Sequence, residues 1–158
     1  MYQYKESGLD NVYLENGYRN HKTPYGTGVS IVDTEGLHKA IGHGLIAMQN
    51  PLNGAELRFL RLEMETTQKD LATMLGTTEQ TLRLWEKNRA KSINGTADRL
   101  LRTLYADYVG GRGSVGRMLK RMADIRAREH TAAYFRADKT HGWSQSDDQS
   151  PEHSQARA

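Results

Sequence analysis

The 158-residue sequence contains no cysteine. Without thiols the chain cannot form disulfides, hold zinc through thiolates or use a cysteine nucleophile. It also has no apolar run near the roughly eighteen residues of a membrane-spanning helix. A charged-then-apolar leader is absent as well. These absences predict a cytoplasmic protein without a signal peptide or a membrane segment.

Patterns that carry catalysis or bind cofactors are equally scarce. The sequence shows no Ser-His-Asp context, no phosphate-cradling glycine loop and no pair of acids in an apolar setting. His38 and His43 stand five residues apart on an expected helix. They would point about 140° apart, so local geometry does not let them share a metal ion. We therefore expect no enzyme activity, no metal site and no cofactor.

The net charge of +3 is unevenly distributed. Residues 110–143 hold eight Lys and Arg against three Asp and Glu, whereas residues 1–53 hold four against five. The basic segment could add non-specific affinity for phosphates, or it could be the solvated face of a helix, and the sequence leaves both readings open. Residues 144–158 are rich in Ser, Gln and Asp, and we expect them to form a disordered tail.

The most specific pattern lies in residues 67–86, which read as two short helices joined by a tight turn. Thr67 is the expected N-cap of the first helix, and Gly76 supplies the left-handed residue that ends it. Residues at the spacing of one helical face should be buried. They are Leu71, Ala72 and Leu75.

The second helix is expected over 78–88, with Thr78 as its N-cap. Leu82 and Trp85 would face inward. The residues left facing outward are Glu79, Gln80, Thr81 and Arg83. Forked polar side chains near the start of a recognition helix are the groups that read base edges in the major groove. The alternative is an ordinary pair of antiparallel helices used for protein contacts.

The strings Gly76-Thr77-Thr78-Glu79-Gln80-Thr81-Leu82 and Trp85-Glu86-Lys87-Asn88 resemble the turn, recognition helix and exit of the phage-repressor (XRE) helix-turn-helix family. The resemblance covers residues 54–109. Asn88 stands where this family usually has glycine, and asparagine is the next-best residue for a left-handed position. The resemblance implies a sequence-specific transcriptional regulator, most simply a repressor of its own promoter or of a mobile-element operon.

The resemblance also assigns contact roles. Base edges would be read by Glu79, Gln80, Thr81 and Arg83, with Gln80 suited to adenine and Arg83 to guanine. Phosphates would be held by Gln68, Thr78, Arg89 and Lys91. One such helix offers few base contacts, so we expect a homodimer on a palindromic double-stranded operator.

Residues 1–50 read as a small β-β-α element. Strands are expected over 11–21 and 27–32, with a turn at 23–26, and a helix over 34–48. The segment is slightly acidic and rich in tyrosine, so residues 1–48 are expected to bind protein rather than DNA or metal. A stacking platform for single-stranded nucleic acid is the alternative role for the tyrosines.

The arrangement of a small β-element ahead of a repressor-type domain is similar to the MqsA-type antitoxins. Their N-terminal unit binds zinc and a toxin. In Tyr18-Arg19-Asn20-His21-Lys22, the residues Arg19 and Lys22 stand where those proteins have thiolates, and two cations cannot hold zinc. The alternative function is therefore an antitoxin or adaptor that captures a partner protein through the N-terminal element.

The expected fold is mainly α. A five-helix, repressor-like helix-turn-helix domain over 54–109 follows the β-β-α element, with a leading helix and a last helix over 96–109. A basic amphipathic helix over 114–143 comes after it, with an apolar stripe too short for a free coiled coil. This stripe would need a partner surface.

Overall fold

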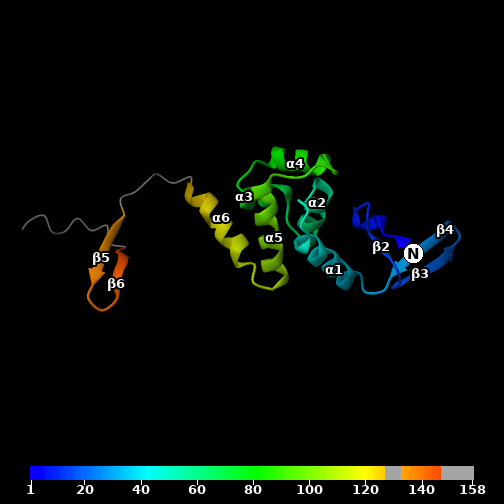
Figure 1. Ribbon diagram of the computed structural model, residues 1–158, viewed down its shortest axis with the longest axis horizontal. Coiled ribbons are helices and arrows are strands. Elements are labelled where there is room, and N and C mark those ends of the chain that lie inside the picture. The colour runs from blue at the N-terminus through cyan, green and yellow to red at the C-terminus, as the bar shows by residue number, and fades with distance from the viewer. Residues whose placement is uncertain (127–132, 147–158) are drawn as a thin grey trace, which may run out of the picture. The chain divides into compact units, whose positions relative to one another are not determined.

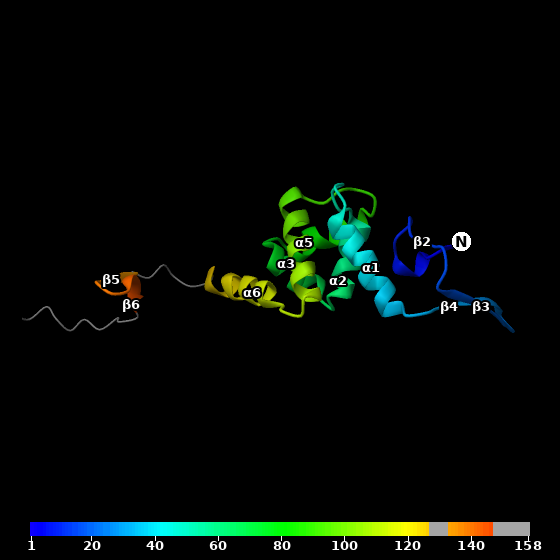
Figure 2. The same cartoon turned by 60° about the horizontal axis from the view of Figure 1, so that its bottom comes forward.

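The computed structural model describes residues 1–126 and 133–146. Within residues 1–126, a body of packed helices surrounds one hydrophobic core (Figures 1 and 2). Its helices are α1 (Thr34–Ala47), α2 (Gly54–Glu63), α3 (Gln68–Leu75), α4 (Glu79–Lys87) and α5 (Gly95–Val109). The largest fully buried side chains are Leu52, Leu57, Leu60, Leu71, Leu82, Leu101 and Tyr105. The mainly α fold with a small β-element ahead of a repressor-like body is confirmed. Residues 54–109 hold four helices where five were expected, and the fifth helix of the body is α1.

Local capping explains where these helices begin. The Asn53 side chain accepts from the backbone N–H of Glu56, and the Glu56 carboxylate accepts from that of Asn53, each at 2.9 Å. This capping box starts α2 at Gly54. The Asn94 side chain accepts from Thr96 N and Ala97 N, so α5 begins one residue before the expected position. The end of α5 at Val109 is as predicted.

The N-terminal strands differ in detail from the prediction. They are β1 (Tyr2–Gln3), β2 (Tyr13–Leu14), β3 (Tyr18–Thr23) and β4 (Gly26–Ile31), and a short 3-10 turn η1 (Lys5–Ser7) follows β1. The strand expected over 11–21 is divided because Gly17 adopts a left-handed φ of 78°. β2 pairs with β1, and β3 forms an antiparallel hairpin with β4 around the predicted turn.

Helix α1 belongs to the helical body through its contacts with α2 and α5. Leu45 joins the core, and Gly42 lies so close to Tyr105 that a Cβ at this position would overlap the phenol. The Tyr4 hydroxyl also lies 2.9 Å from His38 Nε2, and His38 Nδ1 lies 2.6 Å from Glu63 Oε1. These contacts connect the N-terminal segment, α1 and α2.

Helix α6 (Ser114–Arg126) is the described part of the helix expected over 114–143. The expectation is wrong at the far end, where residues 134–146 form a hairpin of β5 (Tyr134–Asp138) and β6 (Gly142–Ser146). The reversal is local: the Asp138 carboxylate accepts from Thr140 N at 2.7 Å, and Gly142 has a left-handed φ of 74°. Residues 144–146 of the expected disordered tail lie in β6, and residues 147–158 lie outside the described part.

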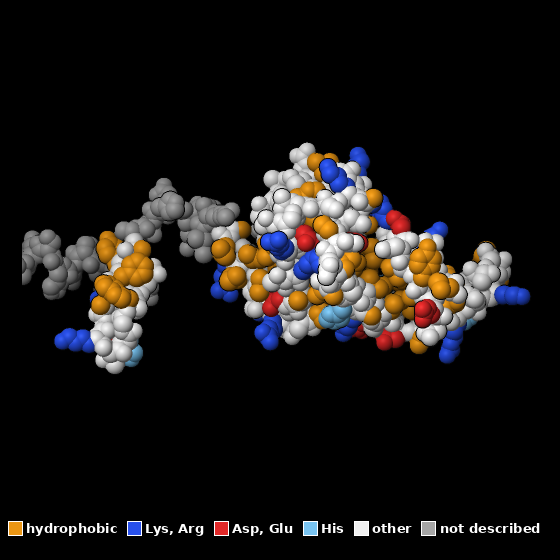
Figure 3. Space-filling view, viewed as in Figure 1, with side chains coloured by type: hydrophobic (Ala, Val, Ile, Leu, Met, Phe, Trp, Pro, Cys, Tyr) orange, Lys and Arg blue, Asp and Glu red, His pale blue; other side chains and the backbone are white. Residues whose placement is uncertain are grey.

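This C-terminal hairpin is a unit of its own. Its aromatic side chains are exposed, with Tyr134 at 56%, Phe135 at 61% and Trp143 at 76%. Hydrophobic side chains gather on its surface (Figure 3). An isolated two-stranded hairpin has no face on which to bury such groups. None of the helices in residues 1–126 and 133–146 is long and apolar enough to cross a membrane.

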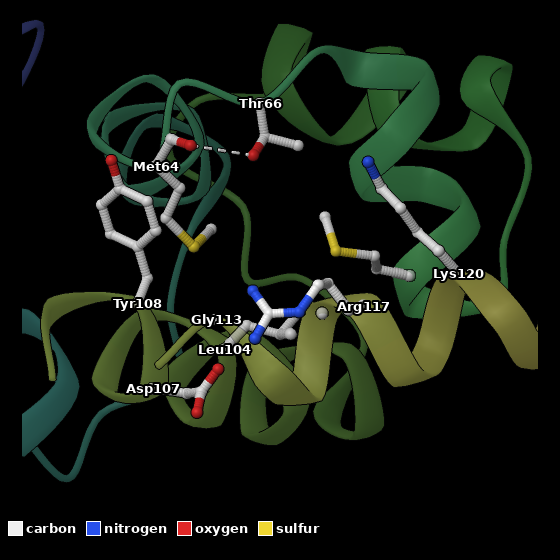
Figure 4. A pocket seen from close by; sticks show the side chains of 10 residues that line it. Met64, Thr66, Leu104, Asp107, Tyr108, Gly113, Arg117 and Lys120 are labelled. Carbon is white, nitrogen blue, oxygen red and sulfur yellow. Dashed lines mark hydrogen bonds between the residues drawn. The ribbon is translucent and has the colours of Figure 1, made fainter. Parts of the chain in front are cut away.

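A pocket of about 170 Å³ lies where α6 meets α5 and the loop between α2 and α3 (Figure 4). In Figure 4 the Arg117 side chain extends toward Asp107, and Met64 and Thr66 lie on the opposite side. The Asp107 carboxylate accepts from Ser114 Oγ and Val115 N, which caps the start of α6. Further along α6, Lys120 Nζ lies 3.6 Å from Asp70 Oδ2. These contacts hold α6 against the helical body, with Val115 and Leu119 packed on the core.

Candidate nucleic-acid interface

The two helices predicted over 67–86 are α3 and α4. Thr67 Oγ1 accepts from Asp70 N at 3.1 Å and caps α3, and Thr78 Oγ1 accepts from Thr81 N at 3.2 Å and caps α4. Between them Gly76 has the expected left-handed φ of 70°. The tight turn follows from two threonine caps and one left-handed glycine.

Three expectations about this pair need correction. Asn88 ends α4 with a φ of −85°, so it does not occupy a left-handed position. On α3 the side chain of Met74 is buried, whereas Leu75 is only half-buried. Likewise Trp85 is half-buried against the core, and Glu86 is the second buried residue of α4 beside Leu82.

The burial of Glu86 is explained by Arg61 on α2. Arg61 Nε donates to Glu86 Oε1 at 2.6 Å, and Arg61 Nη2 donates to Glu86 Oε2 at 3.2 Å. The Gln68 amide donates to the same Oε2 at 2.7 Å, and Arg61 Nη1 donates to Thr66 O at 3.1 Å. Because each charge has several partners, the network fixes α4 relative to α2 and to the start of α3.

The candidate base-reading residues lie together on the outer side of α4. Gln80 and Arg83 are exposed, and Glu79 and Thr81 are partly exposed. Arg83 Nη2 donates to Glu79 Oε1 at 2.6 Å, and Arg83 Nε donates to Gln68 Oε1 at 3.2 Å. The Arg83 guanidinium is therefore positioned through Gln68 by the same network that orients the helix.

The candidate phosphate-binding residues are less uniform. Lys91 is exposed after α4, and Thr78 is exposed at the N-terminus of α4, where backbone N–H groups favour an anion. Gln68 is half-buried and shared between Glu86 and Arg83. Arg89 Nη2 donates to Gly8 O at 2.7 Å and lies 3.4 Å from the Asp10 carboxylate. Sequence reasoning did not foresee this contact of Arg89 with the N-terminal segment.

Three further residues of this surface were missed. Arg58 on α2 and Lys69 in the first turn of α3 line a groove beside Gln68 and Glu79. Leu84 is 52% exposed on α4, four residues after Gln80. The spacing from Gln80 was the signal that could have identified Leu84, because residues four apart share a helical face.

The model of the helix-turn-helix family HTH_3 matches residues 57–104. This range contains all of α3 and α4, most of α2 and the first two-thirds of α5. These residues form an XRE-type helix-turn-helix domain. The comparisons with curated proteins and with solved structures gave no match.

The XRE-type domain accounts for about a third of the chain. In helix-turn-helix domains the second helix of the pair is the recognition helix and the first crosses the DNA backbone. In this chain α4 and α3 stand at these two positions. Domains of this family bind DNA and regulate transcription, so the chain is a DNA-binding regulator.

Proposed function

We propose that the protein is a sequence-specific, dimeric transcriptional regulator that reads the major groove of its operator with α4. One observation carries the proposal: the exposed Gln80 and Arg83 lie on a helix that is fixed by the buried Arg61–Glu86 pair. Base reading requires side chains that are solvent-accessible and held in place by a rigid scaffold. We propose no catalytic role for any of these residues.

The proposed base contacts follow the chemistry of each side chain. The Gln80 amide would pair with adenine, the Arg83 guanidinium with guanine, and Glu79 with the amino group of cytosine. Thr81 would complete the polar set. The exposed Leu84 adds an apolar side chain of the kind that contacts a thymine methyl group. Arg83 would exchange its bond to Glu79 for one to a base.

The proposed phosphate contacts surround this face. Gln68, Thr78, Arg89 and Lys91 keep the role assigned from the resemblance, and Arg58 and Lys69 add two cations beside the start of α3. Phosphate contacts fix the register of a protein on DNA without reading its sequence. Arg89 could take part only by giving up its contact with Asp10.

Two copies on a palindrome would double the small number of base contacts that one recognition helix offers, which is why we propose a homodimer. Repression would follow from occupying a site that polymerase needs, most simply in the protein's own promoter. Since its ligand would be chromosomal DNA, we place the protein in the cytoplasm.

A footprint of the full-length protein on the DNA upstream of its own gene tests this proposal. We expect two protected half-sites separated by about one helical turn, roughly 10 base pairs, or a multiple of it. The double variant with Gln80→Ala and Arg83→Ala should lose the footprint but keep weak binding to unrelated DNA. A footprint that survives both substitutions would show that another element reads the sequence.

A second candidate function is capture of a partner protein by residues 1–50, as in an antitoxin or adaptor. The observation that favours it is the exposure of large apolar side chains in this segment, among them Tyr13 at 55%, Tyr25 at 100% and Val32 at 52%. An antitoxin should be encoded beside a small toxic protein and co-purify with it. A stand-alone regulator should bind operator DNA with no partner present.

A further inference from the structure

Hairpin β3–β4 carries a net positive charge, although residues 1–53 as a whole are slightly acidic. Residues 16–32 contain Arg19, His21 and Lys22 and no Asp or Glu. The rest of residues 1–53 holds two Lys and five acidic residues. The expectation that this segment avoids DNA followed from its total charge, but the acidic residues all lie outside the hairpin. The hairpin by itself is positive.

Both faces of the hairpin are open to solvent. Every residue of β3 after Tyr18 is exposed, and no residue of β4 is fully buried. Tyr25 at the tip is completely exposed. A two-stranded ribbon needs a third strand or a helix to form a stable core. Because the faces of β3–β4 are exposed, they are available to bind a ligand.

One face of this ribbon is polar and flat. Side chains alternate between faces, so Arg19, His21 and Thr23 share one face. Across the strand pair, Arg19 lies opposite Ser30, His21 opposite Gly28 and Thr23 opposite Gly26. His21 Nε2 lies 2.7 Å from Ser30 Oγ, which orders the centre of this face. The glycines Gly26 and Gly28 add no side chains, so the backbone is approachable there.

Contacts connect the hairpin to the helix-turn-helix domain. The rings of Tyr2 and Tyr18 lie 5.4 Å apart, which joins the base of the hairpin to β1. The chain after β1 then reaches Gly8 and Asp10, which contact Arg89, two residues after the end of the recognition helix. The ribbon is therefore linked by successive contacts to the exit of α4.

We infer that hairpin β3–β4 is a second DNA-binding element, a β-ribbon whose face of Arg19, His21, Thr23 and Ser30 lies on duplex DNA. A two-stranded ribbon fits the major groove, about 12 Å wide. Six residue pairs at about 3.3 Å each make the ribbon roughly 20 Å long. Arg19 lies on this face and neutralises a phosphate, and no carboxylate in residues 16–32 opposes it, whereas Lys22 lies on the opposite face. This inference rests on the proposed function, because DNA is already the ligand of the neighbouring domain.

Salt dependence of DNA binding by the full-length protein tests the inference. The variant is Arg19→Ala on the proposed DNA-binding face, and the matched control is Lys22→Ala on the opposite face of the same strand. Both side chains are exposed, so the control removes the same charge from the same strand. Fluorescence anisotropy with a labelled duplex of mixed sequence gives the slope of log Kd against log salt. We expect Arg19→Ala to flatten this slope by about one unit and Lys22→Ala to leave it unchanged.

Other outcomes would contradict either the ribbon or the proposed function. Equal flattening in both variants means that net charge alone is responsible, which overturns the ribbon. An unchanged slope in Arg19→Ala also overturns the ribbon. The proposed function would still stand in that case if the Gln80→Ala, Arg83→Ala variant loses operator binding. A wild-type protein that binds no duplex removes the proposed function itself. Loss of self-association on sedimentation, with DNA binding retained, would make the hairpin a protein interface instead.

Discussion

Arg61 on α2 and Glu86 on α4 form a buried ion pair with two hydrogen bonds, of 2.6 and 3.2 Å. The two side chains are only 11% and 7% exposed. A buried charge that loses its partner bears the full cost of desolvation, whereas an exposed charge is rehydrated. The pair therefore contributes more to holding α4 in place than an exposed ion pair with the same bonds would.

Glu86→Ala should lower the free energy of unfolding by about 3–5 kcal/mol, because the Arg61 guanidinium would be left buried without its counter-charge. Urea denaturation followed by circular dichroism measures the change. Glu79→Ala is the matched control, since its pair with Arg83 is exposed and of ordinary surface type. The control should cost about 0–1 kcal/mol. Equal losses in the two variants would contradict the importance given to burial.

Gly54 is the first residue of α2, and its Cα faces the end of α4. A Cβ there would overlap the backbone oxygen of Trp85, which cannot rotate away as a side chain would. Gly54→Ala should therefore destabilise the domain by about 1–3 kcal/mol, the usual cost of overpacking.

Gly95 provides the matched comparison, because it is the first residue of α5 and has open space around its Cα. Gly95→Ala should be neutral or should stabilise by up to about 1 kcal/mol, through the smaller entropy of the unfolded chain. Thermal unfolding of both variants distinguishes the cases. A stable Gly54→Ala protein would mean that α2 and α4 are not held as closely as described.

The sequence predicted the parts of this molecule in which one local rule acts alone. Threonine caps and a left-handed glycine define α3 and α4, and their positions follow from residues 67–78. The partners of Glu86 and Arg89 were not predictable in this way. They lie 25 and about 80 positions away along the chain, so only the tertiary fold brings them together.

The C-terminal hairpin shows a different limit of sequence reading. Residues 114–126 have a helical stripe, and the expectation extended this period past the point where Tyr134, Phe135 and Trp143 favour strands. The turn signal, Asp138 followed by Gly142, was present in the sequence. The signal that the prediction overlooked was the change from a helical to a strand pattern between residues 126 and 134.

Glu56 gives the domain a pH dependence. Burial raises the pKa of the Glu56 carboxyl above its usual value, although the bond from Asn53 N–H and the charge of Arg102 act in the opposite direction. A carboxyl with a raised pKa in the folded state stabilises the fold at acid pH. This contribution is lost as the pH rises through the folded pKa.

Glu56→Gln keeps an oxygen that accepts from Asn53 N–H but carries no charge. The variant should match the wild type in acid and become the more stable protein as the pH approaches neutrality. Urea denaturation at several pH values gives the two stability curves. Glu35→Gln, at an 83% exposed position, is the control and should leave stability unchanged. A variant less stable than the wild type at neutral pH would mean that the charged cap outweighs its burial.

Lys91 and Gln80 should separate the two kinds of DNA contact. Lys91 is exposed in the short loop after α4, and its charge would hold a phosphate whatever the sequence. Lys91→Ala should therefore weaken binding to operator and unrelated DNA alike and flatten the salt slope by about one unit. Gln80→Ala should cost about 1–3 kcal/mol on the operator and almost nothing on unrelated DNA, because amide pairing with a base depends on sequence. Anisotropy titrations of both variants on both duplexes measure these terms. A loss in Lys91→Ala that is confined to one operator position would make Lys91 a base-reading residue instead.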